Sequence, residues 1–530
     1  MTPDDWIAHD PDPVTAAELA ALDDDELAAR FARPLTFGTA GLRGPVRGGP
    51  DAMNLAVVLR ASWAVAQVLI RRGLHGSSVV VGRDARHGSA EFAAAAAEVF
   101  SAQGFSVITW THPVPTPVVA FAVRHTGAAA GVQITASHNP AGDNGYKVYL
   151  DGGLQIISPA DRDIEAAMAF APPADQIPRL PVAPAGDELV DAYVERAATV
   201  RRTSGATARV ALTAMHGVGG ELAVRALRRA GFDDIHTVAT QFSPDPDFPT
   251  VAFPNPEEPG AADAVLELAT AVDADIAVAL DPDADRCAVG VRTPTGWRML
   301  SGDETGWLLG DYILATLPPG RAATSVVASS MVSSQLLAAI AADHGAHHVQ
   351  TLTGFKWLAR ADAGLPGCSL VYAYEEAIGH CVDPQAVRDK DGISAAVLAC
   401  DLVATLGAQG DSVLAALDRL ALRHGVYTTA AVSRRVDSAE EAAAMMHRLR
   451  TRPPAELAGF PVGAGEHADA VVLTGGDQQT SIRLVVRPSG TEPKVKCYTE
   501  VRRAVTDGLA DARGRATALQ AQLLDIARGW

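Results

Sequence analysis

A serine stands where a strand would lead into a tight turn. Ser137 belongs to the segment TASHNP at residues 135–140, directly after the apolar run GVQI at residues 131–134. A hydroxyl on such an exposed, tightly held turn can act as a nucleophile, and the neighbouring imidazole of His138 could donate to a phosphate or help to exchange a proton. Serine, asparagine and proline also favour ordinary turns, so a purely structural turn is the simpler alternative.

Three carboxylates follow a second apolar run. Asp281, Asp283 and Asp285 come directly after the segment IAVAL at residues 276–280. Their negative charges repel one another unless a cation binds among them, and hard oxygen ligands of this kind suit Mg²⁺. An EF-hand calcium loop needs glycine at its sixth position and glutamate at its twelfth, where this chain has arginines, so that alternative fails. A solvated acidic turn is the other alternative.

Three further stretches combine charged and small residues. Glu375, in YEEAIG at residues 374–379, could accept hydrogen bonds from sugar hydroxyls, although an acidic helix N-terminus has the same pattern. The segment RPSGTEPK at residues 487–494 has the arginine, hydroxyls and glycine of a phosphate cradle, and a basic hairpin loop is its alternative. Glycines around Arg43, in FGTAGLRG at residues 37–44, would allow an extended loop to reach into a cleft.

The elements that position these stretches repeat along the chain. Short runs rich in valine at residues 79–81, 210–212 and 326–328 each lead through a turn of small residues into a helix that ends near a glycine. Their spacing of roughly 120 residues predicts three related α/β domains and no short-period solenoid. The tail differs, because strand-like segments at residues 470–473 and 482–486 flank a polar turn and precede a closing helix. A smaller α+β domain is therefore expected at the C-terminus.

Pro-rich stretches between the copies indicate the domain boundaries. The predicted fold class is α/β, with three related mixed α/β domains and a smaller α+β domain. The four expected domains, each with the stretch that it carries, are 1–190 with the Ser137 loop, 191–305 with the three aspartates, 306–424 with Glu375, and 425–530 with the RPSGTEPK segment.

The composition excludes several classes of partner. The 530 residues include 44 Lys and Arg against 62 Asp and Glu, a net charge of −18, which argues against bulk binding to nucleic acid or to an anionic membrane. The N-terminus shows no basic region followed by an apolar run, and no apolar run is long enough to cross a bilayer. The five cysteines are far apart and odd in number, which favours a reducing compartment. We expect a soluble, cytoplasmic protein.

The strings TASHNP, DPDADR and RPSGTEPK, in this order, resemble the signature loops of the α-D-phosphohexomutase superfamily, which contains phosphoglucomutases and phosphomannomutases. The resemblance spans residues 37 to 494. It implies four domains around a central cleft, with one signature loop from each domain. It also implies an isomerase that moves phosphate between two hydroxyls of one sugar through a phosphoserine and a sugar 1,6-bisphosphate, with one Mg²⁺ in each active site and the bisphosphate as activator.

The resemblance assigns candidate residues loop by loop, with Ser137 as the phosphate carrier and Lys147 as the candidate for proton transfer. The residues that match the family's catalytic positions are Ser137, His138, Lys147, Arg43 and Arg286. Those that match the metal ligands are Ser137, Asp281, Asp283 and Asp285. Those that match substrate-binding positions are Thr353, Gly354, Phe355, Lys356, Glu375, Lys390, Arg487, Ser489, Gly490 and Thr491. A lysine that serves as a base needs burial or cationic neighbours to lower its pKa from about 10.4.

One departure from the family pattern concerns the substrate. Many hexomutases have a serine two residues after the sugar-binding glutamate, whereas this chain has Ala377. Together with FGTAG at residues 37–41, this feature resembles the branch that contains phosphoglucomutase-2 and phosphopentomutase. We expect interconversion of the 1-phosphate and 6-phosphate of glucose, mannose or both. The alternative is a phosphopentomutase that acts on ribose or deoxyribose phosphates.

Two alternatives come from other protein classes. A haloacid-dehalogenase-like phosphatase also has Asp-x-Asp after a strand, but it expects Thr or Val where this chain has Asp285, and it has the motif early in the fold. A non-catalytic sugar-phosphate sensor would have no reason to keep Ser137, His138 and three carboxylates together. We therefore expect a small phosphosugar as partner, no nucleic acid, no membrane, and a monomer or a homodimer.

Overall fold

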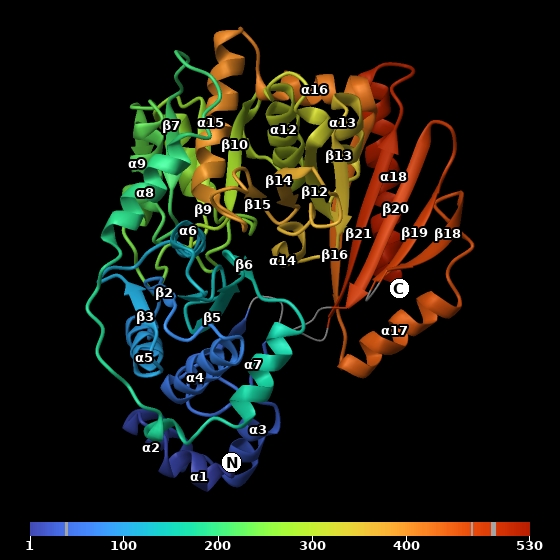
Figure 1. Ribbon diagram of the computed structural model, residues 1–530. Coiled ribbons are helices and arrows are strands. Elements are labelled where there is room, and N and C mark those ends of the chain that lie inside the picture. The colour runs from blue at the N-terminus through green and yellow to red at the C-terminus, as the bar shows by residue number, and fades with distance from the viewer. Residues whose placement is uncertain (38–40, 468–469, 489–493) are drawn as a thin grey trace. The chain divides into compact units, whose positions relative to one another are not determined.

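The computed structural model describes residues 1–37, 41–467, 470–488 and 494–530 (Figure 1). The chain divides into two compact units. The first contains Met1–Leu300, Gly354–Arg360 and Val371–Ala408, and the second contains Ser301–Thr353, Ala361–Leu370 and Gln409–Trp530.

Three short helices precede the first sheet: α1 (Pro3–Ala8), α2 (Pro13–Ala20) and α3 (Asp24–Ala32). Each begins after a residue whose side-chain oxygen accepts a backbone N–H of the first turn, namely Thr2, Asp12 and Asp23. Trp6 of α1 and Leu19 of α2 are buried in the same hydrophobic core as the helices of the first sheet. The N-terminal helices are therefore packed into the first unit.

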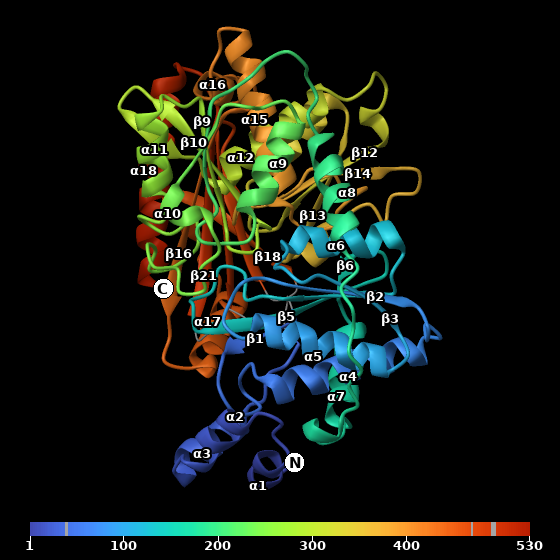
Figure 2. The same ribbon diagram turned by 90° about the vertical axis from the view of Figure 1, so that its left-hand side faces the viewer.

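The first sheet is mixed, with the strand order β1-β5-β4-β2-β3 and β6 paired to β5. β2 runs parallel to β3 and β4, whereas β5 returns antiparallel beside β4 and β1. Figure 2 shows α6 on one side of this sheet and α4 and α5 on the other. The strands are β1 (Leu42–Pro45), β2 (Ser78–Arg83), β3 (Ser106–Thr109), β4 (Ala130–Ile134), β5 (Asp143–Leu150) and β6 (Leu154–Gln155). The helices are α4 (Leu55–Arg71), α5 (Ser89–Ala102), α6 (Thr116–Thr126), α7 (Ala160–Ala169), the short 3₁₀ helix η1 (Ala174–Gln176) and α8 (Asp187–Ala198).

The second sheet repeats this plan, with the order β11-β10-β9-β7-β8. β7 runs parallel to β8 and β9, and β10 returns antiparallel beside β9 and β11. The strands are β7 (Val210–Thr213), β8 (Ile235–Thr237), β9 (Ile276–Leu280), β10 (Cys287–Thr293) and β11 (Gly296–Met299). The helices are α9 (Gly220–Arg229), α10 (Ala239–Phe242), α11 (Asp263–Ala271) and, later in the chain, α15 (Gly392–Ala408), which packs on α8, α9 and β10.

The third sheet contains β12 (Ser325–Ser330), β13 (His347–Thr351), β14 (Ser369–Glu375) and β15 (Gly379–Cys381). β12 and β13 are parallel, and β14 and β15 are antiparallel, so this sheet is also mixed. The associated helices are α12 (Gly302–Ala315), the 3₁₀ helix η2 (Ala322–Thr324), α13 (Leu336–His344), α14 (Phe355–Leu358) and α16 (Val413–His424).

The C-terminal sheet is antiparallel, with the order β16-β21-β20-β19-β18-β17. α18 packs on β16 and β21, and Leu523 of α18 is fully buried in the core that it forms with them. The strands are β16 (Val426–Arg435), β17 (Glu456–Leu457), β18 (Phe460–His467), β19 (Ala470–Gly476), β20 (Thr480–Pro488) and β21 (Lys494–Arg503), and the helices are α17 (Ala439–Thr451) and α18 (Leu509–Gly529). The predicted hairpin and closing helix are confirmed.

The three predicted strand–turn–helix copies are confirmed as β2–α5, β7–α9 and β12–α13. The glycines predicted at the helix ends, Gly104, Gly231 and Gly345, all have positive φ (84°, 89° and 71°). This is the left-handed conformation that ends a helix and that a side chain disfavours. The fold class is therefore as predicted: three mixed α/β sheets with their helices, followed by a smaller α+β portion.

Two further observations concern the cysteines and the apolar helices. All five cysteines are free thiols. Within the described ranges, no single helix has the length and apolar character needed to cross a bilayer, and α15 with α16 meets those criteria only when the two are counted together.

Candidate active site

The nucleophile candidate lies on a constrained turn at the end of β4, in the first unit. The Ser137 N–H donates to the Thr135 hydroxyl at 2.8 Å, and Ser137 itself has a φ of 54°. A serine in this left-handed region is strained, and such strain is held in place by the surrounding structure. The hydroxyl of Ser137 donates to Asp281 Oδ2 at 2.9 Å and lies 3.2 Å from Nδ1 of His138. The turn therefore presents the hydroxyl to the acidic cluster.

Arg86, which the sequence analysis did not single out, holds this turn by its backbone. Its guanidinium donates to four carbonyl oxygens, those of Ser137 and Asn139 at 2.6 Å, Pro140 at 2.7 Å and Asp143 at 3.2 Å. Arg86 is buried, and burial lowers its pKa, while nearby carboxylates, Asp84 first, counteract this. A fork of fixed donors can hold several carbonyls at once, so Arg86 fixes the shape of the Ser137 loop.

The three aspartates form the predicted cluster at the end of β9. Ligand atoms of Asp281, Asp283 and Asp285 all lie within 4.8 Å of one another, and all three residues are buried. One oxygen of Asp283 and one of Asp285 are buried without a hydrogen-bond partner. Buried carboxylate oxygens without a donor are costly, and a hard divalent cation would satisfy them. The donor set therefore fits Mg²⁺.

The directions of the pKa shifts within the cluster show how burial and mutual repulsion act on the three carboxylates. Burial, with repulsion from Asp283 and Asp285, raises the pKa of Asp281 well above its usual range. Burial also acts to raise the pKa of Asp283, but the ammonium of Lys147 and the hydroxyl of Thr116, which donates at 2.5 Å, outweigh it and lower that pKa. Asp281, the member that contacts Ser137, therefore has the least compensated charge.

Lys147 reaches the cluster from β5. Its Nζ donates to Asp283 at 2.6 Å and to Asp285 at 2.7 Å. Burial would lower the pKa of Lys147, but these two carboxylates outweigh it and raise the pKa. To act as a base near neutral pH, Lys147 would need a lowered pKa. The structure shows the opposite direction, because anionic neighbours surround the ammonium where cationic ones were needed.

Three more predicted residues lie around Ser137. Arg43 donates to the Asn139 side chain at 3.0 Å, and burial lowers its pKa. Arg286 donates its backbone N–H to Asp281 at 3.0 Å, and its guanidinium lies 3.5 Å from Glu257. Burial, followed by the two positive guanidinium groups, lowers the pKa of His138 well below its usual value. His138 is therefore a neutral imidazole near pH 7.

The predicted sugar-binding carboxylate belongs to the same unit. Glu375, at the end of β14, accepts the Gly354 N–H at 2.7 Å, and burial raises its pKa. Lys390 Nζ lies 3.2 Å from Asp285 and 5.6 Å from the centre of the Phe355 ring. Lys390 thus links the Glu375 side of the site to the acidic cluster.

For the remaining predicted substrate-binding residues, the structure describes fewer contacts. Lys356 is buried beside Trp357, with its Nζ 5.9 Å from the indole ring. Thr353 and Arg487 belong to the second unit, Arg487 within β20. Ser489, Gly490 and Thr491 lie outside the described residues.

Sequence reasoning also missed Thr116 and did not foresee the hydrogen bonds of Asp389. Asp389 accepts hydrogen bonds from the Tyr149 hydroxyl at 2.8 Å and from Gln155 at 2.7 Å, beside Lys390. Asp389 belongs to the segment DKDG at residues 389–392, which resembles a substrate-contacting segment of the family. Thr116 had no signal, because a single threonine at a helix start usually serves the helix.

Comparison with known proteins identifies the class. All four domain profiles of one family match: phosphoglucomutase/phosphomannomutase α/β/α domain I at residues 34–172, domain II at 189–296, domain III at 301–437 and the C-terminal domain at 461–512. The chain belongs to the phosphoglucomutase/phosphomannomutase family, within the α-D-phosphohexomutase superfamily, and it is an isomerase that acts as a phosphosugar mutase.

Individual relatives differ in their named substrates. A Haemophilus influenzae protein named "Probable phosphomannomutase" is 41% identical over 466 residues, which cover 85% of this chain and 93% of the relative. Human phosphopentomutase is 33% identical over 557 residues, covering 94% and 90%. A crystal structure of a phosphoglucomutase/phosphomannomutase family protein from Burkholderia thailandensis has the same fold, with a TM-score of 0.70, 21% identity and coverage of 91% and 95%.

Proposed function

We propose that the protein interconverts the 1-phosphate and the 6-phosphate of glucose, mannose or both through a phosphorylated Ser137 and a sugar 1,6-bisphosphate. The observation that carries the proposal is the 2.9 Å contact between the Ser137 hydroxyl and Asp281, because it joins a strained nucleophile to the acidic cluster. The bisphosphate is both the intermediate and the activator, since loss of phosphate from Ser137 would leave no group to transfer.

Asp281, Asp283 and Asp285, together with the Ser137 oxygen or its phosphate, would hold one Mg²⁺. When bound, Mg²⁺ would neutralise negative charge on these carboxylates and on the phosphoryl group. A phosphoserine carries about −1.5 to −2 charge, so an uncompensated carboxylate cluster beside it would repel it. The unpartnered oxygens of Asp283 and Asp285 support this assignment.

The protein's own side chains then move the proton and hold the phosphate. In one half-reaction a sugar hydroxyl attacks phosphoserine, the bond between phosphorus and Ser137 Oγ breaks, and the hydroxyl proton must leave. In the other half-reaction the Ser137 hydroxyl attacks the second phosphate of the bisphosphate, the bond between that phosphorus and the sugar oxygen breaks, and the sugar oxygen gains a proton while Ser137 Oγ loses one. We assign Lys147 to this exchange: in each half-reaction its ammonium, which Asp283 and Asp285 maintain, would donate a proton to the leaving oxygen, and the resulting amine would take up the proton of the attacking hydroxyl.

The other residues would hold the phosphate groups and the sugar without transferring a proton. Neutral His138 would donate one N–H to the phosphate, and Arg43 and Arg286 would add positive charge around it. Glu375, Lys390 and residues 353–356 would contact the sugar. Arg487 with Ser489, Gly490 and Thr491 would hold the second phosphate of the substrate.

A second substrate class is favoured by one specific observation. Ala377 removes a hydroxyl that would contact a hexose, and one of the relatives is a human phosphopentomutase. The test compares kcat/KM for glucose 1-phosphate, mannose 1-phosphate and ribose 1-phosphate in one assay series. A higher kcat/KM for a hexose phosphate supports the proposal. A higher kcat/KM for ribose 1-phosphate would instead identify the protein as a phosphopentomutase.

We further propose four domains at 1–190, 191–305, 306–424 and 425–530, which place one signature loop in each. We propose a cytoplasmic monomer or homodimer whose partner is a phosphosugar and neither nucleic acid nor membrane. The net charge of −18 and the five free thiols support this part of the proposal.

A further inference from the structure

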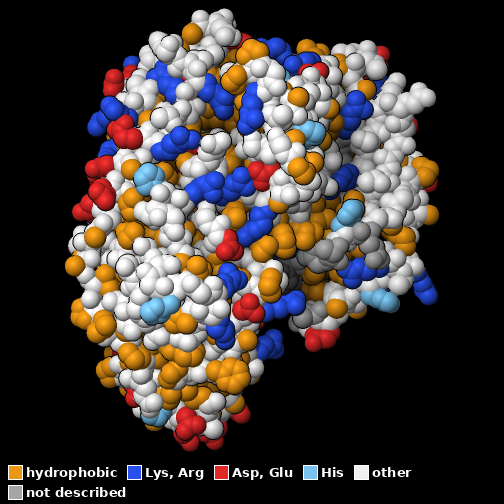
Figure 3. Space-filling view, in the orientation of Figure 1, with side chains coloured by type: hydrophobic (Ala, Val, Ile, Leu, Met, Phe, Trp, Pro, Cys, Tyr) orange, Lys and Arg blue, Asp and Glu red, His pale blue; other side chains and the backbone are white. Residues whose placement is uncertain are grey.

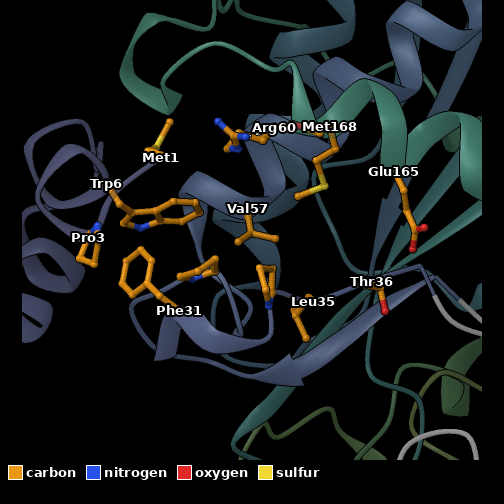
Figure 4. A pocket seen from close by; sticks show the side chains of 13 residues that line it. Met1, Pro3, Trp6, Phe31, Leu35, Thr36, Val57, Arg60, Glu165 and Met168 are labelled. Atoms are coloured by element: carbon orange, nitrogen blue, oxygen red, sulfur yellow. Dashed lines mark hydrogen bonds between the residues drawn. The ribbon is translucent and has the colours of Figure 1, made fainter. Parts of the chain in front are cut away.

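A cavity of about 440 Å³ lies between the N-terminal helices and the first sheet's helices, within the first unit (Figure 4). α1 and α3 contribute Trp6 and Phe31 to its wall, and α4 and α7 contribute Arg60 and Met168. None of the candidate catalytic, metal-binding or sugar-binding residues lines it. Its volume falls within the range of small-molecule pockets, which is about 300–1,000 Å³.

One end of this cavity carries a buried positive charge that no carboxylate balances. Arg60 is 9% exposed and donates to the carbonyl oxygens of Met168 at 3.0 Å, Ala171 at 3.2 Å and Pro172 at 3.0 Å. Within the described part of the chain, no carboxylate lies within ion-pair distance of Arg60, and burial lowers its pKa without an opposing anion. Carbonyl dipoles compensate a buried cation only in part, so this end favours an anion.

The indole ring of Trp6 packs against that charge. The Arg60 guanidinium is 5.9 Å from the centre of the Trp6 ring, and Figure 4 shows the indole between Arg60 and the Phe31 ring. Trp6 is 6% exposed, and its Nε1–H is buried without a hydrogen-bond partner. A buried indole N–H normally finds an acceptor. Trp6 and Arg60 together thus lack an anionic acceptor.

Apart from Thr36 and Glu165, most of the remaining wall is apolar. Phe31 packs edge-on against Trp6 at 6.0 Å between ring centres, and Leu35, Val57 and Met168 continue the surface. Figure 3 shows hydrophobic side chains gathered over the part of the first unit where α1, α3 and α7 lie in Figure 1. At the edge of the cavity Met1 is 56% exposed. An apolar body would therefore be buried favourably here.

We propose that this cavity binds a small amphipathic anion, with a carboxylate at Arg60 and Trp6 and an aromatic or aliphatic body against Phe31, Leu35 and Val57. The carboxylate would accept from the Trp6 N–H and balance the Arg60 charge. Both groups are otherwise buried without an anionic partner, which is why a neutral compound of the same shape would bind less tightly.

Binding here would also reach the candidate active site. Leu35 and Thr36 line the cavity, and the next residue, Phe37, donates its N–H to Glu165 of the cavity wall at 2.7 Å. The same chain segment leads to Arg43 in β1. An occupant that shifts Leu35 or Glu165 would disturb the backbone at Phe37, which precedes Arg43 in the sequence. This coupling rests on the proposed role of Arg43, whereas the binding itself does not.

The direct test is calorimetric titration of the whole protein with cinnamate and with cinnamyl alcohol, which differ mainly in charge. We expect cinnamate to bind once per chain and at least tenfold more tightly than the alcohol. Trp6→Phe, which keeps a ring and removes the N–H, should weaken cinnamate binding several-fold. Equal affinities for the two probes, or no cinnamate binding at millimolar concentration, would overturn the proposal.

A second variant changes the cavity wall and leaves Arg60 in place, because loss of Arg60 could disturb the end of α7. Ala169 is exposed and lines the cavity, so Ala169→Phe should fill it and abolish cinnamate binding. Ala166→Phe, also exposed on α7 but outside the cavity, is the matched control and should bind as the unmodified protein does. Unchanged binding to Ala169→Phe would place the anion elsewhere and refute the site.

Mutase assays at saturating cinnamate test the coupling separately. We expect kcat or KM to change at least twofold in the unmodified protein and to stay constant in Ala169→Phe. Binding without any kinetic change would refute the coupling to Arg43 and leave the binding site standing. If the unmodified protein has no mutase activity in the absence of cinnamate, that result contradicts the proposed function instead.

Discussion

Arg86 donates to the carbonyl oxygen of Ser137 at 2.6 Å, so a buried guanidinium holds the backbone of the candidate nucleophile. The same group binds three further carbonyls of the loop, and Phe248 covers it at 5.0 Å from its ring centre. The position of the Ser137 hydroxyl beside Asp281 thus depends on a buried side chain that binds the loop through its backbone carbonyls. Arg86 is a positioning residue.

Arg86→Lys should keep the charge but lose the fork that spans four carbonyls. We expect kcat to fall about 10²-fold while KM changes little, because a displacement of about 1 Å at a reacting group costs that much. Steady-state kinetics check this. Arg83→Lys is the control, since Arg83 also donates to backbone carbonyls, those of Asp84 and Thr111, but not to the Ser137 loop. Equal losses in both variants would contradict the positioning role.

Lys147 provides a second test, because its charge and its ability to transfer a proton can be separated. Lys147→Arg keeps a cation near Asp283 and Asp285 but cannot give up its proton near neutral pH. We expect kcat to fall about 10²–10⁴-fold, the usual contribution of general acid–base catalysis, with a melting temperature close to that of the unmodified protein. A variant that keeps more than a tenth of the original kcat would show that the proton moves through another group.

The acidic cluster predicts a dependence on divalent cations. Removal of Mg²⁺ with a chelator should abolish turnover, and added Mg²⁺ should restore it. Mg²⁺ should also raise the melting temperature by binding to the folded state, and Asp283→Asn should lose this rise. Asp275→Asn, at an exposed position just before β9, is the control that should keep it. Full activity in the presence of the chelator would exclude the proposed metal site.

The local motifs of the site could be predicted from the sequence because each is a strand followed by a short turn. Ser137 and the three aspartates stand out in the sequence because each group follows directly after a short apolar run. Arg86 and Thr116 could not be found in this way, and the partner of Asp389 could not be named, because the residues that they bind lie 51, 167 and 240 residues away. Contacts at such separations depend on the order of strands in a sheet and on packing between domains. Local patterns do not encode either one.

The pKa of Lys147 shows the same limit. Whether burial or cationic neighbours lower the pKa of Lys147 depends on which side chains β5 faces across the fold. Asp283 and Asp285 lie in the loop between β9 and β10 of the second sheet, 136 and 138 residues further along the chain. By contrast, the fold class was predictable, because valine-rich runs, small turns and terminal glycines repeat locally in three copies.

Glu500, in β21, gives a prediction about pH and stability. It accepts hydrogen bonds from Ser334 and from the Gln335 N–H, and burial raises its pKa to about 7 from a usual 4.5. The folded state therefore binds a proton that the unfolded state releases between pH 4.5 and 7. Its contribution to stability is present below pH 4.5 and is lost as the pH rises to about 7, by an amount on the order of 3 kcal/mol.

Glu500→Gln should remove this dependence, because the amide oxygen can accept the same two hydrogen bonds and does not titrate. We expect the melting temperature of the variant, relative to the unmodified protein, to be higher at pH 8 than at pH 5. Glu456→Gln, at an exposed position of β17, is the matched control and should show the same difference at both pH values. A relative melting temperature of Glu500→Gln that falls with pH would contradict the assigned sign.

The central claim is that one seryl oxygen, Ser137 Oγ, receives and returns the phosphoryl group. The most direct measurement is phosphopeptide mapping of the enzyme after turnover with ³²P-labelled glucose 1,6-bisphosphate, alongside Ser137→Ala. We predict label on the peptide that contains Ser137 and none on the variant, which should also lose mutase activity. Label on any other peptide, or full activity in Ser137→Ala, would contradict the account.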